Sequence, residues 1–379
     1  MSLRCFNTVS IRLAVFAVGL FAAGALRAQN TTVSTDPVGA VVIPLLGGSD
    51  TLLSLPLHQP VALEAAVAGV SGNVVTLNLS GANLTANQYV YQGSGTSTYY
   101  VQMITGNREG YYYTITANDN ASNLTLNLNG DTGFSGNVNV GDSLQVIPYW
   151  TLNTVFPSGS GLHTGTNINT ATQSTILVPP ASTAGINLAA AAVYFYDAGG
   201  APFGPGWRKS GDSTASDHYP DVIIPPDSSL IVRHPVSASN TTVTLVGSVP
   251  MSEQTIVLNT LVANTKQDNA VALPVPSTVT FGGSGLNNVL THATNLNPLD
   301  TVLLFDPTTV SQNKAATATY YYYNGGTFGA AGWRKSGDTS TVRDNDVLMS
   351  PGTAFTIRLG ARAQPTTLLW TFLPSYLTN

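Results

Sequence analysis

The chain has 379 residues and little charge, because Lys, Arg, Asp and Glu make up only 9% of it. Acidic residues outnumber basic ones by 19 to 14 and no basic stripe is present, which argues against a nucleic-acid-binding surface. Polarity comes instead from Thr, Ser and Asn interleaved with Val, Leu, Ile and Tyr, a composition typical of β-strands, and the 36 Gly and 22 Pro suit turns.

Residues 1–28 have the pattern of a secretory signal peptide. Arg4 and Arg12 precede an uncharged apolar stretch from Leu13 to Ala25, which ends in an A-x-A cleavage pattern. This stretch is shorter than the roughly 20 residues that a membrane-spanning helix needs. We therefore expect an exported protein, secreted or on the cell surface, without a membrane span in its mature chain. Cys5, the only cysteine, would leave with the signal.

The rest of the chain predicts an all-β fold. Apolar and polar residues alternate in short runs bounded by Gly, Pro and Asn, which is typical of antiparallel sandwiches or barrels. Val61–Ala68 suits either a helix or a strand. The clearest alternating runs, in chain order, are residues 73–79, 124–128, 242–246 and 355–359.

One phrase occurs twice: Gly206–Asp212 and Gly332–Asp338 both read Gly-Trp-Arg-Lys-Ser-Gly-Asp. The same shift of 126 residues carries Tyr194-Phe195-Tyr196 onto Tyr320-Tyr321-Tyr322, and a shift of 125 carries Arg233 onto Arg358. This spacing predicts a duplicated module. Within each copy, the Tyr strand and the Trp phrase are predicted to form a hairpin.

Three consecutive modules are predicted, over residues 36–157, 158–263 and 264–379. The second and third contain the repeated phrase. Each module ends in an apolar run that leads into a proline, and we expect these runs to be closing strands. They cover residues 150–157, 243–250 and 368–374.

Several specific phrases are spread along the chain. They are Thr35–Gly39, Gly48–Thr51, Asn107–Tyr111, Ile147–Leu152, Lys266–Ala270 and the two Trp-Arg-Lys phrases. In these phrases the chain resembles an uncharacterised family of exported paralogous proteins found in Verrucomicrobia. The resemblance covers nearly the whole mature chain and implies a modular exported β protein, with no established activity.

No catalytic residue is nominated, and we expect a protein that is not an enzyme. Gly141-Asp142-Ser143-Leu144 spells an esterase motif, but the stretch around it predicts antiparallel strands rather than the parallel α/β sheet of those enzymes. No pair of the five histidines has the spacing of metal ligands.

Carboxylates cluster after each Trp phrase. Oxygen ligands of this kind on one loop can hold Ca²⁺, although Asp is also common in turns. We therefore expect no cofactor apart from a candidate structural Ca²⁺. Its candidate ligands are Asp212, Asp217, Asp221, Asp338, Asp344 and Asp346.

The repeated Trp-Arg pairs, Trp207-Arg208 and Trp333-Arg334, allow two interpretations. A Trp beside tyrosines either fills the core of its hairpin or forms a platform on which a sugar stacks. We expect a non-catalytic structural or adhesive surface protein whose partner is a surface polymer, a glycan or copies of itself. The alternative is a carbohydrate-binding protein that uses these aromatic platforms, and an outer-membrane β-barrel is less favoured.

Overall fold

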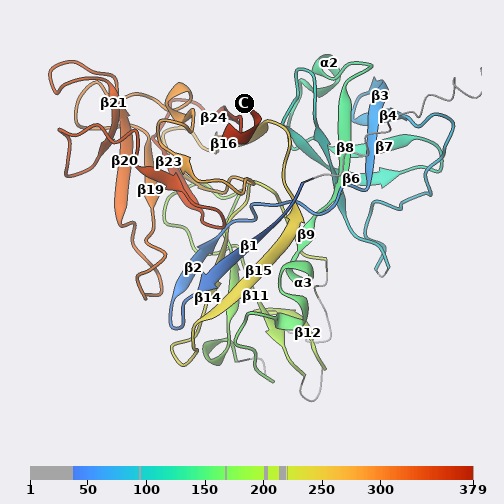
Figure 1. Ribbon diagram of the computed structural model, residues 1–379, viewed down its shortest axis with the longest axis horizontal. Helices are drawn as coiled ribbons and strands as arrows, with labels where there is room; N and C mark the ends of the chain where they lie inside the picture. Colours follow the sequence, from blue (N-terminus) through green and yellow to red (C-terminus); the bar gives the residue numbers. More distant parts are fainter. Residues whose placement is uncertain are drawn as a thin grey trace, which may run out of the picture. The chain divides into compact units, whose positions relative to one another are not determined.

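The computed structural model describes residues 37–93, 95–166, 169–199, 204–212, 219 and 221–378. Nearly all regular structure there is antiparallel β-sheet, which confirms the predicted fold class (Figure 1). The signal peptide prediction and Cys5 lie outside these residues. The described helical segments are short: α2 (Phe134–Asn137), α3 (Leu152–Val155) and 3-10 turns at Pro157–Gly159, Thr170–Thr172, Leu286–Asn288 and Ser375–Leu377.

A closed barrel, called here the barrel, is formed by residues 63–148. Its strands follow the order β3-β4-β7-β6-β5-β8 around the ring. Alternation fills its interior: in β4 and β7 every second side chain is buried, and Phe134 of α2 packs on Tyr113 at 4.8 Å between ring centroids. The strands are β3 (Leu63–Ser71), β4 (Val74–Asn78), β5 (Tyr99–Met103), β6 (Tyr112–Asn118), β7 (Asn123–Asn127) and β8 (Ser143–Pro148).

The second part, the Trp207 module, combines strands that precede the barrel in the sequence with strands that follow it. It contains a five-stranded sheet, β12-β11-β10-β14-β2, and the pairs β1-β15 and β9-β13. Figure 1 shows β1 running beside β15. The strands are β1 (Val38–Leu45), β2 (Asp50–Leu53), β9 (Trp150–Thr151), β10 (Thr175–Val178), β11 (Ala192–Asp197), β12 (Gly206–Lys209), β13 (Ile223–Ile224), β14 (Leu230–Arg233) and β15 (Thr241–Ser248).

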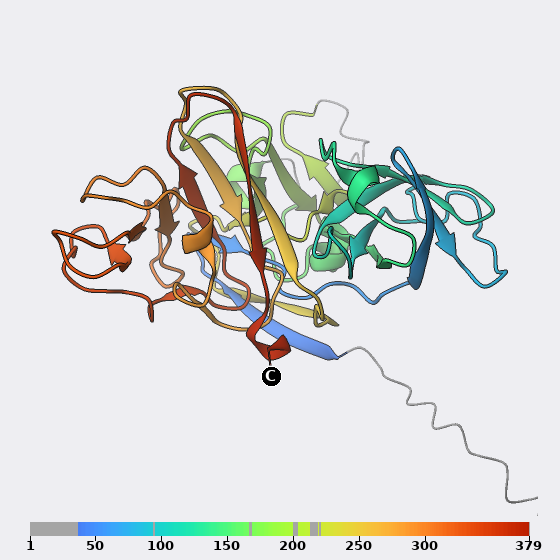
Figure 2. The ribbon, with the colours of Figure 1, turned by 90° about the horizontal axis from the view of Figure 1, so that it is seen from above.

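The third part, the Trp333 module, has the same sheet order without an inserted barrel. Its five-stranded sheet is β21-β20-β19-β23-β17, and its pairs are β16-β24 and β18-β22. In Figure 2 the red strand β24 lies beside the gold β16. The strands are β16 (Gln254–Thr260), β17 (Gln267–Val271), β18 (Val279–Thr280), β19 (Thr301–Leu304), β20 (Ala318–Tyr323), β21 (Gly332–Lys335), β22 (Val347–Met349), β23 (Phe355–Leu359) and β24 (Thr366–Phe372).

The hairpins of the two modules also share one register. Tyr196 pairs with Trp207 and Tyr322 pairs with Trp333, so the Tyr strand and the Trp phrase of each module form the predicted hairpin. Arg233 and Arg358 likewise lie on corresponding strands, β14 and β23.

The strand pairs group the chain differently from the predicted boundaries. β1 and β2 fall within the predicted first module, yet they pair with β15 and β14. β16 falls within the predicted second module but pairs with β24. The barrel is therefore an insertion between β2 and β9, and the Trp207 module includes sequence on both sides of it.

The structure also differs from the prediction at the first closing strand. Only Trp150 and Thr151 of residues 150–157 form a strand, and a helical turn follows at once. The Thr151 side chain accepts the Thr154 N–H and the Thr154 hydroxyl accepts the Thr151 N–H, a capping box that starts α3. The other two predicted runs lie mostly within β15 and β24, and Val61–Ala68 enters β3 as a strand.

The two modules contact each other through matching residues in both directions. Asp50 binds Arg233 in the Trp207 module and accepts the N–H of Asn313 from the Trp333 module at 2.7 Å. Asp268 binds Arg358 in the Trp333 module and accepts the N–H of Asn187 from the Trp207 module at 2.8 Å. The contact is thus reciprocal, like the isologous interface of a symmetric dimer.

Candidate functional site

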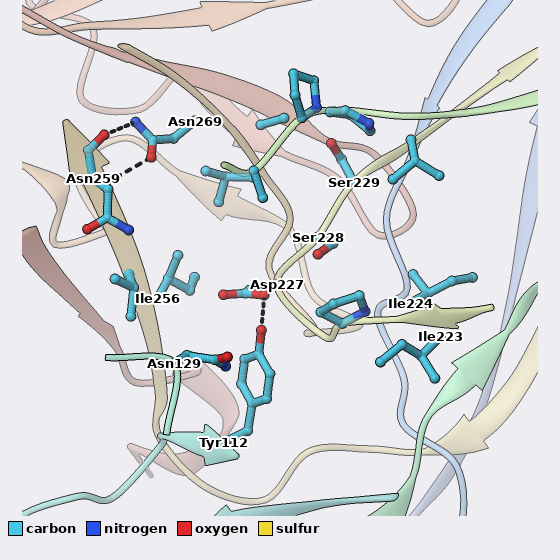
Figure 3. A pocket seen from close by; sticks show the side chains of 18 of the residues that line it. Tyr112, Asn129, Ile223, Ile224, Asp227, Ser228, Ser229, Ile256, Asn259 and Asn269 are labelled. Atoms are coloured by element: carbon cyan, nitrogen blue, oxygen red, sulfur yellow. Dashed lines mark hydrogen bonds between the residues drawn. The ribbon is translucent and has the colours of Figure 1, made fainter. Parts of the chain in front are cut away.

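A cavity of about 830 Å³ lies where the barrel, the Trp207 module and the Trp333 module meet (Figure 3). Its size is within the range of about 300–1,000 Å³ that is usual for small-molecule sites. Aromatic side chains come from the barrel and from β11, branched aliphatic side chains from β13 and β16, and polar side chains from all three parts. The lining includes Tyr111, Tyr112, Tyr113, Asn129, Tyr194, Ile223, Ile224, Asp227, Ile256, Asn259 and Asn269.

Asp227 belongs to a tight turn, Pro225–Ser229, between β13 and β14. The turn is closed by the Ser228 N–H, which donates to the Pro225 carbonyl at 3.1 Å. The Asp227 carbonyl accepts the N–H of Ala272 from the Trp333 module at 3.0 Å. The backbone of this residue is therefore held at the contact between the two modules.

The side chain of Asp227 reaches the barrel. The Tyr112 hydroxyl donates to Asp227 Oδ1 at 2.7 Å, and Figure 3 shows the carboxylate in the middle of the cavity with the labelled residues around it. One residue thus connects all three parts, because it belongs to the Trp207 module, its carbonyl binds the Trp333 module and its side chain binds the barrel.

Burial controls the protonation of this pair. Removal from water raises the pKa of Asp227 above its ordinary 3.8, and the hydrogen bond from Tyr112 opposes that rise. Burial and then the nearby Asp227 carboxylate raise the pKa of Tyr112 well above 10.0. None of the ion pairs among the described residues involves Asp227.

The other charged groups of the cavity are neutralised by neighbours. Arg108 donates to both oxygens of Asp131 at 2.8 Å, and Tyr113 donates to the same carboxylate at 2.7 Å. Asp268 accepts two hydrogen bonds from Arg358, at 2.7 and 2.9 Å. The carboxylate of Asp227 is therefore the unbalanced charge of the described lining.

A polar group on the opposite wall offers further hydrogen bonds. The Asn259 N–H donates to Asn269 Oδ1 at 2.9 Å, and Asn269 Nδ2 donates to the Asn259 carbonyl at 3.2 Å (Figure 3). Asn259 Oδ1 accepts from the Thr367 hydroxyl at 2.8 Å, which orients its amide and leaves the amide nitrogen as a donor toward a ligand.

The structure contradicts the alternative in which the repeated tryptophans form aromatic platforms. Trp207 and Trp333 are 2% and 1% exposed, and each lies in the hydrophobic core of its own module. A tyrosine meets each ring edge-on, with centroids 5.7 Å apart for Tyr196 and Trp207 and 5.8 Å for Tyr322 and Trp333. Neither indole has an open face on which a sugar can stack, so the packing interpretation describes both.

The neighbouring arginines are buried as well. Arg208 is 3% exposed and lies 4.0 Å from the carboxylate of Asp197. Arg334 is 1% exposed, and the corresponding neighbour is Tyr323, whose ring centre lies 5.7 Å from the guanidinium. Arg208 and Arg334, named with the tryptophans as candidate ligand contacts, therefore belong to the interior of the protein.

The candidate Ca²⁺ ligands that the structure describes are each engaged by a neighbouring protein group. Asp221 accepts a hydrogen bond from the Thr98 hydroxyl, and Asp346 accepts one from the Tyr320 hydroxyl. Asp344 accepts the backbone N–H of Trp333, and all three distances are 2.7–2.8 Å. Asp212 accepts from Tyr219, Asp338 pairs with Arg343, and Asp217 lies outside the described residues. No group of three or more His, Cys, Asp or Glu side chains in the described ranges is arranged to hold a metal ion.

The esterase-like phrase lies in the wall of the barrel. Ser143 of the esterase-like phrase begins β8 and pairs antiparallel with β3 in the barrel wall. Across the part of the chain that the structure describes, no helix is long and apolar enough to cross a membrane.

Sequence reasoning did not identify Asp227 or Tyr112. A signal was nevertheless present, because the repeat aligns Pro225-Pro226-Asp227 with Ser350-Pro351-Gly352. A charged residue thus stands where the other copy has glycine.

Comparison of the chain with protein-family models, with curated proteins and with solved structures gives no match.

Proposed function

We propose that the protein is an exported, non-catalytic adhesive protein of the cell surface that holds a glycan or another hydroxyl-rich surface polymer in the central cavity. The observation that carries this proposal is the cavity itself, about 830 Å³ in size and lined by tyrosines, asparagine amides and one unpaired carboxylate. Planar amide, phenol and carboxylate groups suit sugar hydroxyls, and the apolar walls suit the carbon face of a sugar ring.

Export is part of the same proposal and rests on the pattern of residues 1–28. A chain that works outside the cell needs a stable frame, and a duplicated β module with reciprocal contacts is suited to that task. In that frame the matching ion pairs Asp50–Arg233 and Asp268–Arg358 join β2 to β14 and β17 to β23. N-terminal sequencing of protein from the native host is expected to begin near residue 26 or 29, and an intact N-terminus would contradict export by cleavage.

A glycan array with the mature protein tests the binding function, and a variant that fills the cavity locates it. Ala181 is exposed in a loop at the cavity, so Ala181→Trp adds bulk there without disturbing a core. Ala363→Trp is the matched control, because Ala363 is exposed and does not line the cavity. We expect loss of binding with the first variant only. Equal binding by both variants would contradict the proposed site.

A purely structural role is the second candidate, and the reciprocal contact between the modules favours it. In that case the array shows no bound glycan, and the protein is expected to associate with copies of itself. Sedimentation at increasing protein concentration distinguishes the two functions, since a glycan-binding monomer keeps its sedimentation coefficient.

A further inference from the structure

The carboxylate of Asp227 is available to a ligand. Oδ1 accepts the Tyr112 hydroxyl at 2.7 Å, and apart from the backbone N–H of Asp227 itself no other described residue hydrogen-bonds the carboxylate. The side chain is enclosed by the cavity, and its backbone is fixed through the Ala272 N–H. A carboxylate that is positioned by its backbone and has a single hydrogen bond from another side chain is preorganised to accept a donor from a bound molecule.

The charge of the cavity defines the kind of donor. Arg108 neutralises Asp131, and Arg358 neutralises Asp268, so an ionised Asp227 leaves one uncompensated negative charge. A buried charge without a partner is costly, and a cation on the ligand removes that cost while it forms a charge-assisted hydrogen bond. A neutral hydroxyl would satisfy the oxygen but leave the charge.

We propose that this cavity selects sugars that carry a free, protonated amino group, and that the ammonium group pairs with the Asp227 carboxylate. The proposal rests on the proposed function and names the ligand class of the same cavity. The Asn259 amide on the opposite wall would bind a hydroxyl of the same sugar, and Ile223, Ile224 and Ile256 would contact its carbon face.

The test uses two sugars that differ mainly in charge. Short β-1,4-linked glucosamine oligomers carry free amines, and the N-acetylated oligomers of the same length have the same linkage with neutral amides. Isothermal titration of the full mature protein at pH 7 is expected to show at least tenfold tighter binding of the glucosamine oligomer. This comparison needs no variant, so it does not depend on how a substitution folds.

Asp227→Asn then assigns the preference to one residue, because it keeps the shape and removes the charge. We expect the preference to fall to about twofold or less while the acetylated sugar still binds. A wild-type protein that binds both sugars equally, or neither, overturns the amine proposal, and so does a preference that persists in Asp227→Asn. Ala181→Trp separates the two claims: if an acetylated glycan binds wild type and is lost in this variant, the cavity function stands even when the amine preference fails.

Discussion

Asn187 and Asn313 make the same hydrogen bond in opposite directions between the two modules. Asn187 Oδ1 accepts from Arg358 Nη2 at 2.8 Å, and Asn313 Oδ1 accepts from Arg233 Nη2 at 2.6 Å. Both asparagines adopt a left-handed backbone conformation, with φ of 51° and 52°. Each module therefore contributes one asparagine to the other module. This asparagine binds the arginine of the ion pair at the edge of the other module's sheet.

Replacing either asparagine by alanine should weaken the contact between the modules. The substitution removes the hydrogen bond to an arginine. It also puts alanine, which has a Cβ but no polar side chain, into a left-handed backbone conformation. We therefore expect the free energy of unfolding to fall by about 2 kcal/mol. Urea unfolding of Asn187→Ala and Asn313→Ala measures it. Glycine at the same positions restores the backbone freedom alone and should recover roughly half of the loss. Wild-type stability in both alanine variants would show that the loops do not hold the modules together.

The two buried arginines should respond differently to replacement by methionine. Arg208→Met leaves the carboxylate of Asp197, which is 2% exposed, without its cation, and should cost about 3–5 kcal/mol. Arg334 has no carboxylate partner among the described residues, because Tyr323 occupies the corresponding position. Arg334→Met removes a buried charge without stranding another, so its cost should stay below about 1 kcal/mol. Thermal unfolding of both variants provides the comparison, and equal losses would contradict it.

Stability should depend on pH through Asp227. Its pKa is raised in the folded protein, so the folded state binds the proton more tightly than the unfolded state does. The contribution of Asp227 is therefore greatest below pH 3.8 and is lost as the pH rises from that value through the raised pKa. Asp227→Asn cannot ionise, and its stability relative to wild type should increase over this window. Urea midpoints of both proteins from about pH 3 to 8 test this, and a constant difference between them would argue against it.

The tryptophans should be shielded from solvent in the folded protein. Trp207, Trp333 and Trp370 are at most 2% exposed, and Trp150 is half-buried. Iodide is therefore expected to quench little of the native fluorescence and much more of it in urea. Glycans that bind the protein should leave this quenching unchanged, since none of the three buried rings is open to a ligand. Strong iodide quenching of more than one tryptophan in the native protein would restore the platform interpretation.

The regular parts of this fold were predictable because alternation and repetition are local or periodic signals. Strand β23 is an example, because Phe355 and Ile357 are buried while Thr356 and Arg358 between and beside them remain partly exposed. The pairing of β1 with β15 was not predictable in this way, because about 200 residues separate the two strands and no local pattern specifies such a partner.

The site was missed for a related reason. Tyr112 and Asp227 are 115 residues apart and meet only because the inserted barrel packs against the Trp207 module. The repeated tryptophans were the candidate ligand contacts instead, because a repeat preserves core residues as faithfully as binding residues. The informative position was the one at which the two copies differ.

For the proposed ligand, that difference limits the number of binding sites in one chain. Gly352, the counterpart of Asp227, has φ of +83°, and a Cβ there would lie 2.6 Å from Ile43 Cγ1, so β1 closes the space that remains open beside Asp227. The two modules thus share their matching ion pairs, but only the Trp207 module has a carboxylate side chain with open space beside it at this position. Titration with the proposed ligand should therefore saturate at one molecule per chain.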